Sequence, residues 1–134
     1  MQKLEHIGIA VKSLTQSVPL FEALLNTHCY KTEMVETEKV NTAFLKIGDT
    51  KVELLESLQP EGVISKFIEH RGEGIHHIAF EVADIFEEVK RLENEGFSFI
   101  NTTPHRGADN KLVCFLMPKT TNGVLVELCQ EIQS

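Results

Sequence analysis

The two halves of the chain repeat one arrangement of apolar segments and polar residues. In the first half, His6 opens the apolar segment 6–11, and Glu53 lies 47 positions later in the middle of the segment 51–55. In the second half, His77 opens the segment 77–82, and Glu127 lies 50 positions later within the segment 124–128. Such a repeat predicts a fold built from two similar modules, with the matching residues at matching places.

Hydrophobic periodicity predicts the order strand, helix and then three strands in each half. In the first half we expect strands at 4–11, 28–35, 41–47 and 50–57, with a helix at 14–26. In the second half we expect strands at 75–82, 97–100, 111–117 and 123–130, with a helix from Asp84 to near Gly96. A short amphipathic helix at 62–70 joins the halves, and the loop 101–110 is expected to be a mobile rim of the site. The prediction is an α+β fold, a single domain over 1–134 made of the βαβββ modules 1–58 and 74–131.

Composition argues against some classes of partner and favours one cellular location. A net charge of −7 without a lysine or arginine cluster argues against a nucleic-acid surface. No apolar run approaches the roughly 20 residues that cross a bilayer, so we expect no membrane insertion. The three cysteines, Cys29, Cys114 and Cys129, form no CxxC pair, and no apolar signal segment precedes the first strand. Reduced thiols in the cytoplasm are therefore the expectation.

Side-chain alternation predicts which polar residues share a face of the sheet. His6 points away from Ile7 and Ile9, whose branched side chains are expected to cover the helix, and Glu53 shares the face of His6. The same reasoning places His77 and Glu127 together in the second half. Ionised carboxylates within apolar strands are costly unless they are paired or bind a cation. We therefore expect His6, Glu53, His77 and Glu127 to bind a divalent metal whose open positions receive a substrate.

The donor set limits the choice of metal. Imidazole nitrogens and carboxylate oxygens suit Co²⁺, Mn²⁺, Fe²⁺, Ni²⁺ or Zn²⁺, and the absence of thiolate ligands removes the usual mark of a structural zinc site. Alternation sends His76 to the opposite face. A solvated or packing role is the expectation for the remaining polar residues, and contact with a ligand is the alternative for His105, Cys129 and the lysines. These residues are His28, His70, His105, Lys39, Lys111, Lys119 and Cys129. Of these, the three lysines are the candidates for phosphate contacts at the rim.

Several segments resemble the vicinal oxygen chelate superfamily, which includes glyoxalase I, and within it the methylmalonyl-CoA epimerase group. The segments that carry the resemblance run from end to end of the chain: 4–11, 39–45, 48–56, 71–82 and 118–128. The first is common to the superfamily. The Gly-Glu-Gly-Ile-His-His-Ile-Ala segment from Gly72 and the Gly-Val-Leu-Val-Glu-Leu segment from Gly123 are more specific for the epimerases.

The resemblance implies a glyoxalase-like fold, in which the sheets of the two modules curl around a metal cleft, usually in a homodimer. It also implies an isomerase that uses Co²⁺ and an acyl-CoA substrate and epimerises methylmalonyl-CoA. The expected reaction removes the α-proton and returns a proton to the opposite face through an enolate, with Glu127 as one catalytic carboxylate and Glu53, or else a residue near Thr42, as the group for the other face. Two positions depart from the family pattern. Thr42 stands where some epimerases carry a glutamate base, and Asn110 stands where a glycine is common.

Two other functions fit the same framework. A glyoxalase I-type lyase would act on a glutathione hemithioacetal with the same metal ligands. A non-catalytic protein that binds a drug or metabolite would generally lack the complete metal set.

Overall fold

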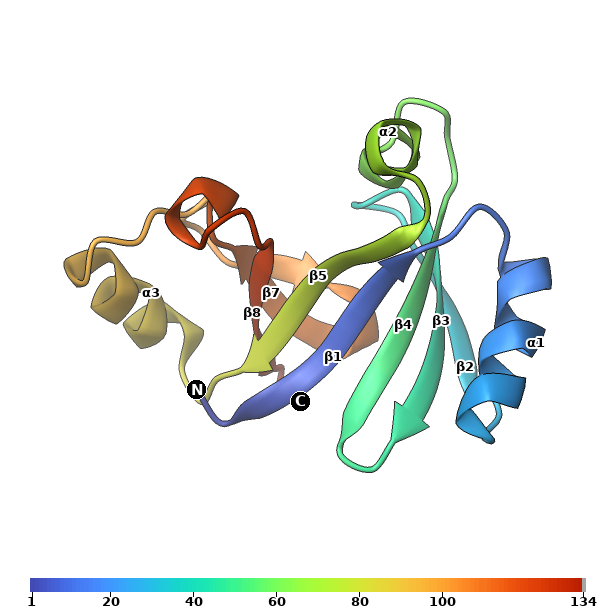
Figure 1. Ribbon diagram of the computed structural model, residues 1–134. Helices are drawn as coiled ribbons and strands as arrows, with labels where there is room; N and C mark the ends of the chain where they lie inside the picture. Colours follow the sequence, from blue (N-terminus) through green and yellow to red (C-terminus); the bar gives the residue numbers. More distant parts are fainter. Residues whose placement is uncertain (134) are drawn as a thin grey trace. The chain divides into compact units, whose positions relative to one another are not determined.

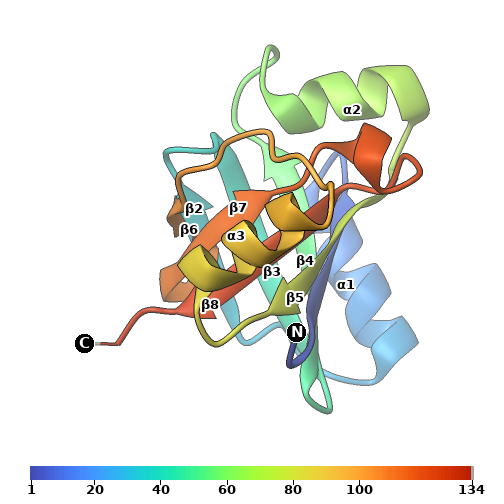
Figure 2. The same ribbon diagram turned by 90° about the vertical axis from the view of Figure 1, so that its left-hand side faces the viewer.

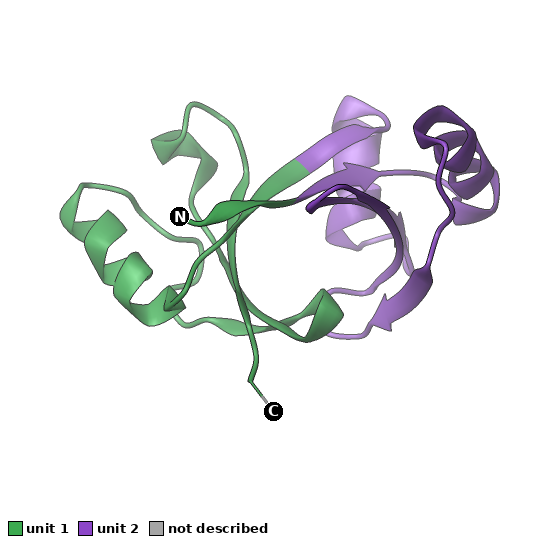
Figure 3. Cartoon of the chain, turned by 90° about the horizontal axis from the view of Figure 1, so that it is seen from below, with its two compact units in different colours: residues 1–5, 77–134 green, residues 6–76 purple. Residues whose placement is uncertain are grey.

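The computed structural model describes residues 1–133 and divides into two compact units. Unit 2 comprises residues 6–76, and unit 1 comprises residues 1–5 together with 77–134 (Figure 3). The division falls inside two strands, between Glu5 and His6 and between His76 and His77. Both histidines of the repeat therefore lie at the points where the chain passes from one unit to the other.

In each half of the chain, a strand, a helix and three further strands follow one another in the predicted order (Figure 1). The elements in the first half of the chain are β1 (Lys3–Ala10), α1 (Leu14–Leu25), β2 (Lys31–Val35), β3 (Val40–Ile47), β4 (Thr50–Ser57) and α2 (Val63–Arg71). Those in the second half are β5 (Gly74–Glu81), α3 (Ile85–Asn94), β6 (His105–Gly107), the 3-10 helix η1 (Ala108–Asn110), β7 (Lys111–Phe115), the 3-10 helix η2 (Pro118–Thr120) and β8 (Val126–Glu131). The predicted α+β class with two βαβββ modules is confirmed. Among the described residues, no helix has the length and apolar character needed to cross a membrane.

In unit 2, helix α1 covers one face of strands that follow the order β2-β3-β4-β1. The helix begins after Ser13, whose hydroxyl accepts a hydrogen bond from the backbone N–H of Gln16, and it ends at Asn26 in a left-handed conformation. Its apolar side packs on alternate residues of β3 and β4. The cluster contains Val11, Leu14, Ala43, Leu45, Val52 and Leu54. The intervening strand residues, among them Thr42 and Glu53, therefore lie on the face opposite α1.

Unit 1 repeats this arrangement with α3 over strands in the order β5-β8-β7-β6 (Figure 2). Asp84 caps the helix by accepting hydrogen bonds from the N–H groups of Phe86 and Glu87. Ile85, Val89 and Leu92 of α3 pack on buried residues of β7 and β8. The first residues of the chain also belong to this unit. The N–H of Gln2 donates to the carbonyl of Glu81 at 2.8 Å, so the start of β1 lies beside the end of β5.

The edge strand of unit 1 differs from the prediction. Residues 97–100 form no strand, and only Phe99 makes an isolated antiparallel bridge, to Leu116. Strand β6 lies instead within the expected loop 101–110, where no alternation of apolar residues predicts a strand. It pairs with β7 through a tight turn in which Asp109 and Asn110 adopt φ values of 60° and 54°. Asp and Asn tolerate this left-handed region better than most residues, which allows Asn110 to replace a glycine.

Lys111 is buried in unit 1, whereas the sequence leads us to expect a solvated lysine or a phosphate contact at the rim. Its ammonium lies 3.9 Å from a carboxylate oxygen of Glu5, and the two side chains are 6% and 2% exposed. It also donates a hydrogen bond to Glu131 at 3.3 Å. A buried ammonium needs carboxylate partners to offset the loss of water, and Glu5 supplies one from a strand far away in the sequence.

Replacement of Lys111 by methionine leaves the Glu5 charge buried without this counter-ion. We expect Lys111→Met to lower the free energy of unfolding by about 3 kcal/mol, the usual cost of breaking a buried ion pair. The double variant Glu5→Gln/Lys111→Met should lose less than Lys111→Met alone. Urea denaturation of the three proteins measures this. A double variant that loses as much stability as Lys111→Met, or more, would show that the unpaired charge of Glu5 is not the source of the loss.

A second charged contact makes the stability of unit 1 depend on pH. The Glu88 carboxylate accepts a hydrogen bond from the Arg91 guanidinium and lies 3.4 Å from the α-amino group of Met1. The hydrogen bond from Arg91 lowers the pKa of Glu88 below its ordinary value, against the opposing effect of partial burial. The ionised form is thus favoured in the folded protein. Its contribution is present above the unfolded pKa and is lost as the pH falls through the lower folded pKa.

Glu88→Gln should therefore lower the stability at pH 7 by up to about 1 kcal/mol, since the contact is near the surface. The difference from the wild type should close as the pH falls below about 4, where the unfolded carboxyl becomes protonated. Urea denaturation at pH 7 and pH 3 measures the two differences, with Glu93→Gln on the same helix as the control. A loss of equal size at both values of pH would contradict this assignment.

Candidate functional site

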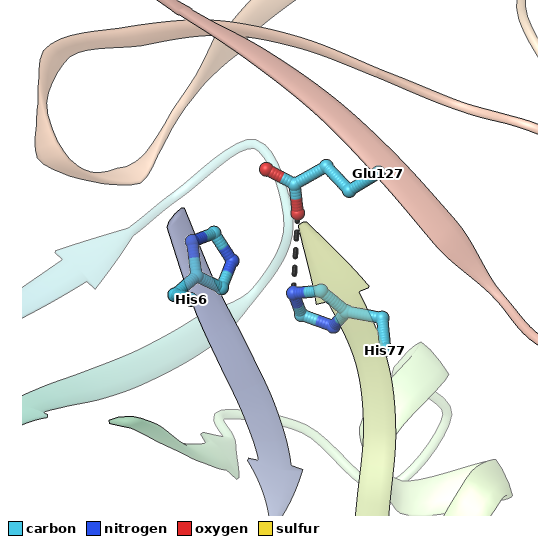
Figure 4. Close-up of side chains that lie close together, drawn as sticks. All are labelled: His6, His77 and Glu127. Atoms are coloured by element: carbon cyan, nitrogen blue, oxygen red, sulfur yellow. Dashed lines mark ion pairs between the residues drawn. The ribbon is translucent and has the colours of Figure 1, made fainter. Parts of the chain in front are cut away.

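Unit 1 holds His77 and Glu127 as a buried pair on neighbouring parallel strands. In the register of β5 with β8, Ala79 lies opposite Glu127, so His77 precedes the register partner of Glu127 by two residues and shares its face. His77 Nε2 lies 3.1 Å from Glu127 Oε1, and each side chain is 7% exposed (Figure 4). Phe115 of β7, opposite Glu127, packs edge-on against the His77 ring with the centroids 5.8 Å apart. Ring packing and strand register together fix the position of the imidazole.

Unit 2 holds His6 and Glu53 in the same relation. Strand β1 is parallel to β4, and Gly8 lies opposite Glu53, so His6 again precedes the register partner of the glutamate by two residues. His6 Nδ1 lies 3.1 Å from Glu53 Oε2, and the side chains are 6% and 5% exposed. The aromatic neighbour is repeated as well, because Phe44 of β3 lies opposite Glu53. The structure thus brings each predicted histidine together with its predicted glutamate inside one unit.

The donor atoms of each pair fit adjacent ligands of one divalent ion. Two ligand atoms that lie about 2.1 Å from an ion, at right angles to each other, are about 3 Å apart. The observed nitrogen-to-oxygen distance is 3.1 Å in both pairs. A buried carboxylate is costly without a cation or a hydrogen-bond donor beside it. The chemistry and spacing of the donors therefore suit a metal such as Co²⁺, Mn²⁺, Fe²⁺, Ni²⁺ or Zn²⁺.

The two fully buried cysteines lie close to Glu127, whose charge favours the neutral thiol. Burial raises the pKa of the Cys114 thiol to about 12, and the charge of Glu127 adds to this effect. Burial and the same charge also raise the pKa of Cys129, whose Sγ contacts the carbonyl oxygen of Phe80 at 3.5 Å. Both side chains are neutral thiols at physiological pH, and only a thiolate is a good ligand or nucleophile.

The other histidines of the chain lie in different surroundings. His76 packs edge-on against Phe67 of α2, with the ring centroids 5.0 Å apart. His70 hydrogen-bonds through Nδ1 to the backbone carbonyl of Lys66, and the side chain of His28 is almost fully exposed. His105 lies on β6 opposite Val113, and its Nδ1 is buried without a hydrogen-bond partner. The prediction that His105 belongs to a loop is therefore wrong.

Two features of the face opposite α1 in unit 2 are not predicted from the sequence. The Thr42 side chain is fully buried, and its hydroxyl makes no hydrogen bond. Glu33 of β2 lies directly opposite Thr42 in the antiparallel register. The sequence carries no signal of either feature, because the register of β2 with β3 is a tertiary property.

Comparison with known proteins gives the family of the chain. Residues 5–115 match the model of the Glyoxalase/Bleomycin resistance protein/Dioxygenase superfamily. A mitochondrial methylmalonyl-CoA epimerase of Dictyostelium discoideum is 39% identical over 127 residues, which cover 94% of this chain and 76% of that protein. An ethylmalonyl-CoA/methylmalonyl-CoA epimerase of Cereibacter sphaeroides is 35% identical, over 96% of this chain and 97% of that protein.

A solved structure agrees with the sequence matches. A methylmalonyl-CoA epimerase in complex with methylmalonyl-CoA and NH4+ superimposes with a TM-score of 0.93 at 32% identity, covering 98% of this chain and 95% of that chain. Three observations point to the same superfamily: the family match, the repeated βαβββ order and the paired His and Glu residues. The chain belongs to the Glyoxalase/Bleomycin resistance protein/Dioxygenase superfamily, within which it is similar to the methylmalonyl-CoA epimerases.

Proposed function

We propose that the protein is a metal-dependent epimerase of methylmalonyl-CoA. The observation that carries the proposal is the buried pair of histidine and glutamate that recurs at 3.1 Å in each unit. It occurs in a chain that resembles methylmalonyl-CoA epimerases over nearly all of its length. The reaction would invert the carbon that lies between a thioester carbonyl and a carboxylate.

We propose that His6, Glu53, His77 and Glu127 together bind one divalent ion. Two imidazoles and two carboxylates form a donor set that suits Co²⁺, the ion we expect, and also Mn²⁺, Ni²⁺, Fe²⁺ or Zn²⁺. When bound, such an ion is a Lewis acid that stabilises negative charge on the substrate oxygens. Burial of all four side chains keeps water away from the donors and strengthens their electrostatic effect.

Glu127 is the proposed proton-transfer group of unit 1. Its carboxylate would take the α-proton of one epimer and return a proton to the same face in the reverse direction. With the ion bound, His77 and Glu127 would be adjacent ligands, and Phe115 packs against the ring of His77. Both contacts keep the carboxylate in one orientation, which a proton transfer requires.

We further propose that the enzyme acts as a homodimer in the cytoplasm.

Glu127→Gln tests this assignment. The amide cannot accept the α-proton, so we expect inversion to fall by about 10²- to 10⁴-fold, the usual contribution of a positioned acid or base. The experiment incubates cobalt-loaded protein with methylmalonyl-CoA of one configuration in D₂O and follows α-proton loss and inversion by NMR, with a chelated sample beside it. Glu131→Gln, on the same strand with an exposed carboxylate, is the control.

Inversion and exchange that depend on the metal in the wild type and the control would support the epimerase. Near-full inversion by metal-bound Glu127→Gln would refute the role of Glu127. Absence of exchange in the metal-loaded wild type would refute the acyl-CoA assignment. Turnover of methylglyoxal with glutathione would then identify a glyoxalase I-type lyase, and tight binding of a metabolite without turnover would identify a binding protein.

A further inference from the structure

Strand β2 is the outermost strand of unit 2 and has one open edge. In the order β2-β3-β4-β1 it pairs with β3 on one side, and no strand within residues 1–133 pairs with its other side. The N–H and C=O groups along such an edge can pair with a strand of another molecule. Thr32 is exposed, and Met34 is 56% exposed. A second chain can therefore reach this edge.

β2 lacks most of the features that block an open edge in other proteins. Natural edge strands are protected by proline, by bulges, by clusters of lysine or by being very short. The edge strand of unit 1, β6, is three residues long and runs directly into the 3-10 helix η1. β2 is five residues long, contains no proline, and carries one lysine and one glutamate on the same face, Lys31 and Glu33. The strand therefore remains able to pair.

Two-fold symmetry limits how two copies of β2 can pair. A two-fold axis perpendicular to a sheet makes the two copies of an edge strand antiparallel, and it keeps the same face of each copy on the same side. Residues that lie opposite each other must then belong to one face of the strand. The axis therefore passes beside a single residue, which lies opposite its own copy. Each possible register is defined by the residue at this centre.

Charge selects one of these registers. A centre at Lys31 or at Glu33 sets that residue against its own copy, and like charges directly opposite each other destabilise a sheet. A centre at Met34 or Val35 sets neither charged residue of the strand against the other. With the centre at Thr32, Lys31 lies opposite the partner's Glu33, and Glu33 lies opposite the partner's Lys31. Two pairs of opposite charge then form across the axis.

The charged side chains already lie together on one face of the strand. Lys31 Nζ lies 3.6 Å from Glu33 Oε1 in the same chain, and the two side chains are 37% and 35% exposed. Lys31 Nζ also lies 4.5 Å from the centroid of the Phe44 ring, which keeps the ammonium over the sheet. Two copies in this register would form a ring of alternating charge. Such local attraction opposes the general repulsion between two chains that each carry a net charge of −7.

We infer that β2 is the interface of the homodimer and pairs with the β2 strand of a second copy about an axis at Thr32. The inference rests on the homodimer of the proposed function and is independent of its reaction. Main-chain hydrogen bonds would join the two strands, as in other cases of strand addition, and the charged pairs would fix the register. The exposed Met34 would lie diagonal to the partner's Thr32.

Charge reversal at the two positions tests the register. Lys31→Glu sets glutamate against glutamate across the axis, and Glu33→Lys sets lysine against lysine. We expect each variant alone to raise the dimer dissociation constant at least about 10-fold, measured by sedimentation velocity over a concentration series. An equimolar mixture of the two variants should restore the wild-type constant, because a chain with two glutamates then meets a chain with two lysines. This rescue would also show that both variants are folded.

Lys46→Glu is the matched control for charge. It makes the same change of charge as Lys31→Glu at an exposed position of β3, away from the open edge. We expect it to dimerise with the wild-type constant. The double variant Lys31→Glu/Glu33→Lys should also do so, because it exchanges the two charges and keeps every pair across the axis opposite in sign.

A crosslink at the centre of the register gives an independent measurement. Opposite residues of antiparallel strands have Cα atoms about 5 Å apart, within the range that a disulfide spans. We therefore expect Thr32→Cys to form a disulfide-linked dimer on mild oxidation, seen by non-reducing electrophoresis. Thr37→Cys is the control, because this threonine is exposed in the turn after β2 and lies far from its own copy in this register. It should form no such dimer, and neither should the wild type.

Three results would overturn the interface at β2. These are a wild-type dissociation constant in both single variants, failure of the mixed variants to dimerise, and absence of the Thr32→Cys crosslink in a dimeric sample. Each would place the second copy on another surface. A wild type that is monomeric at every concentration would overturn the proposed homodimer as well. The proposed reaction is judged separately, by inversion of methylmalonyl-CoA in D₂O, so its failure is distinguished from a failure of the interface.

Discussion

The fold depends on one constraint: each of the two glutamates buried in apolar strands needs a partner that offsets the cost of burying its charge. A glutamate in such a place needs a partner, and in each unit the partner is a histidine two residues before its register position on a parallel strand. The first and last strands of each module must therefore run side by side in the same direction. A parallel neighbour requires a crossover, and the helix with the two intervening strands provides it. The βαβββ order is thus the connection that brings each histidine to its glutamate.

Some features of the candidate site recur in both halves of the chain, and others occur in one half. Each half contributes one buried pair of histidine and glutamate, the proposed metal ligands, and one phenylalanine opposite the glutamate. The next residue pair outward differs between the halves, and that difference places Glu33 beside a hydroxyl without a partner.

The sequence predicts those parts of the molecule that follow from local alternation. Period-2 patterns identify the strands that carry His6, Glu53, His77 and Glu127, and the resemblance to a known family is the source of the proposed substrate class. Strand β6 escapes because residues 101–107 carry no apolar alternation. The burial of Lys111 escapes because its partner Glu5 lies on a strand at the other end of the chain. Glu33 and Thr42 escape for a related reason, since the register of β2 with β3 is a tertiary property.

The central proposal is that His6, Glu53, His77 and Glu127 bind one divalent ion. Cobalt K-edge X-ray absorption, combined with metal analysis of dialysed protein, tests it most directly. The account predicts one cobalt ion per chain with two imidazole and two carboxylate ligands, and loss of the ion when either His6 or His77 is replaced by alanine. Two ions per chain, an ion that survives both replacements, or a ligand shell with a single imidazole would contradict it.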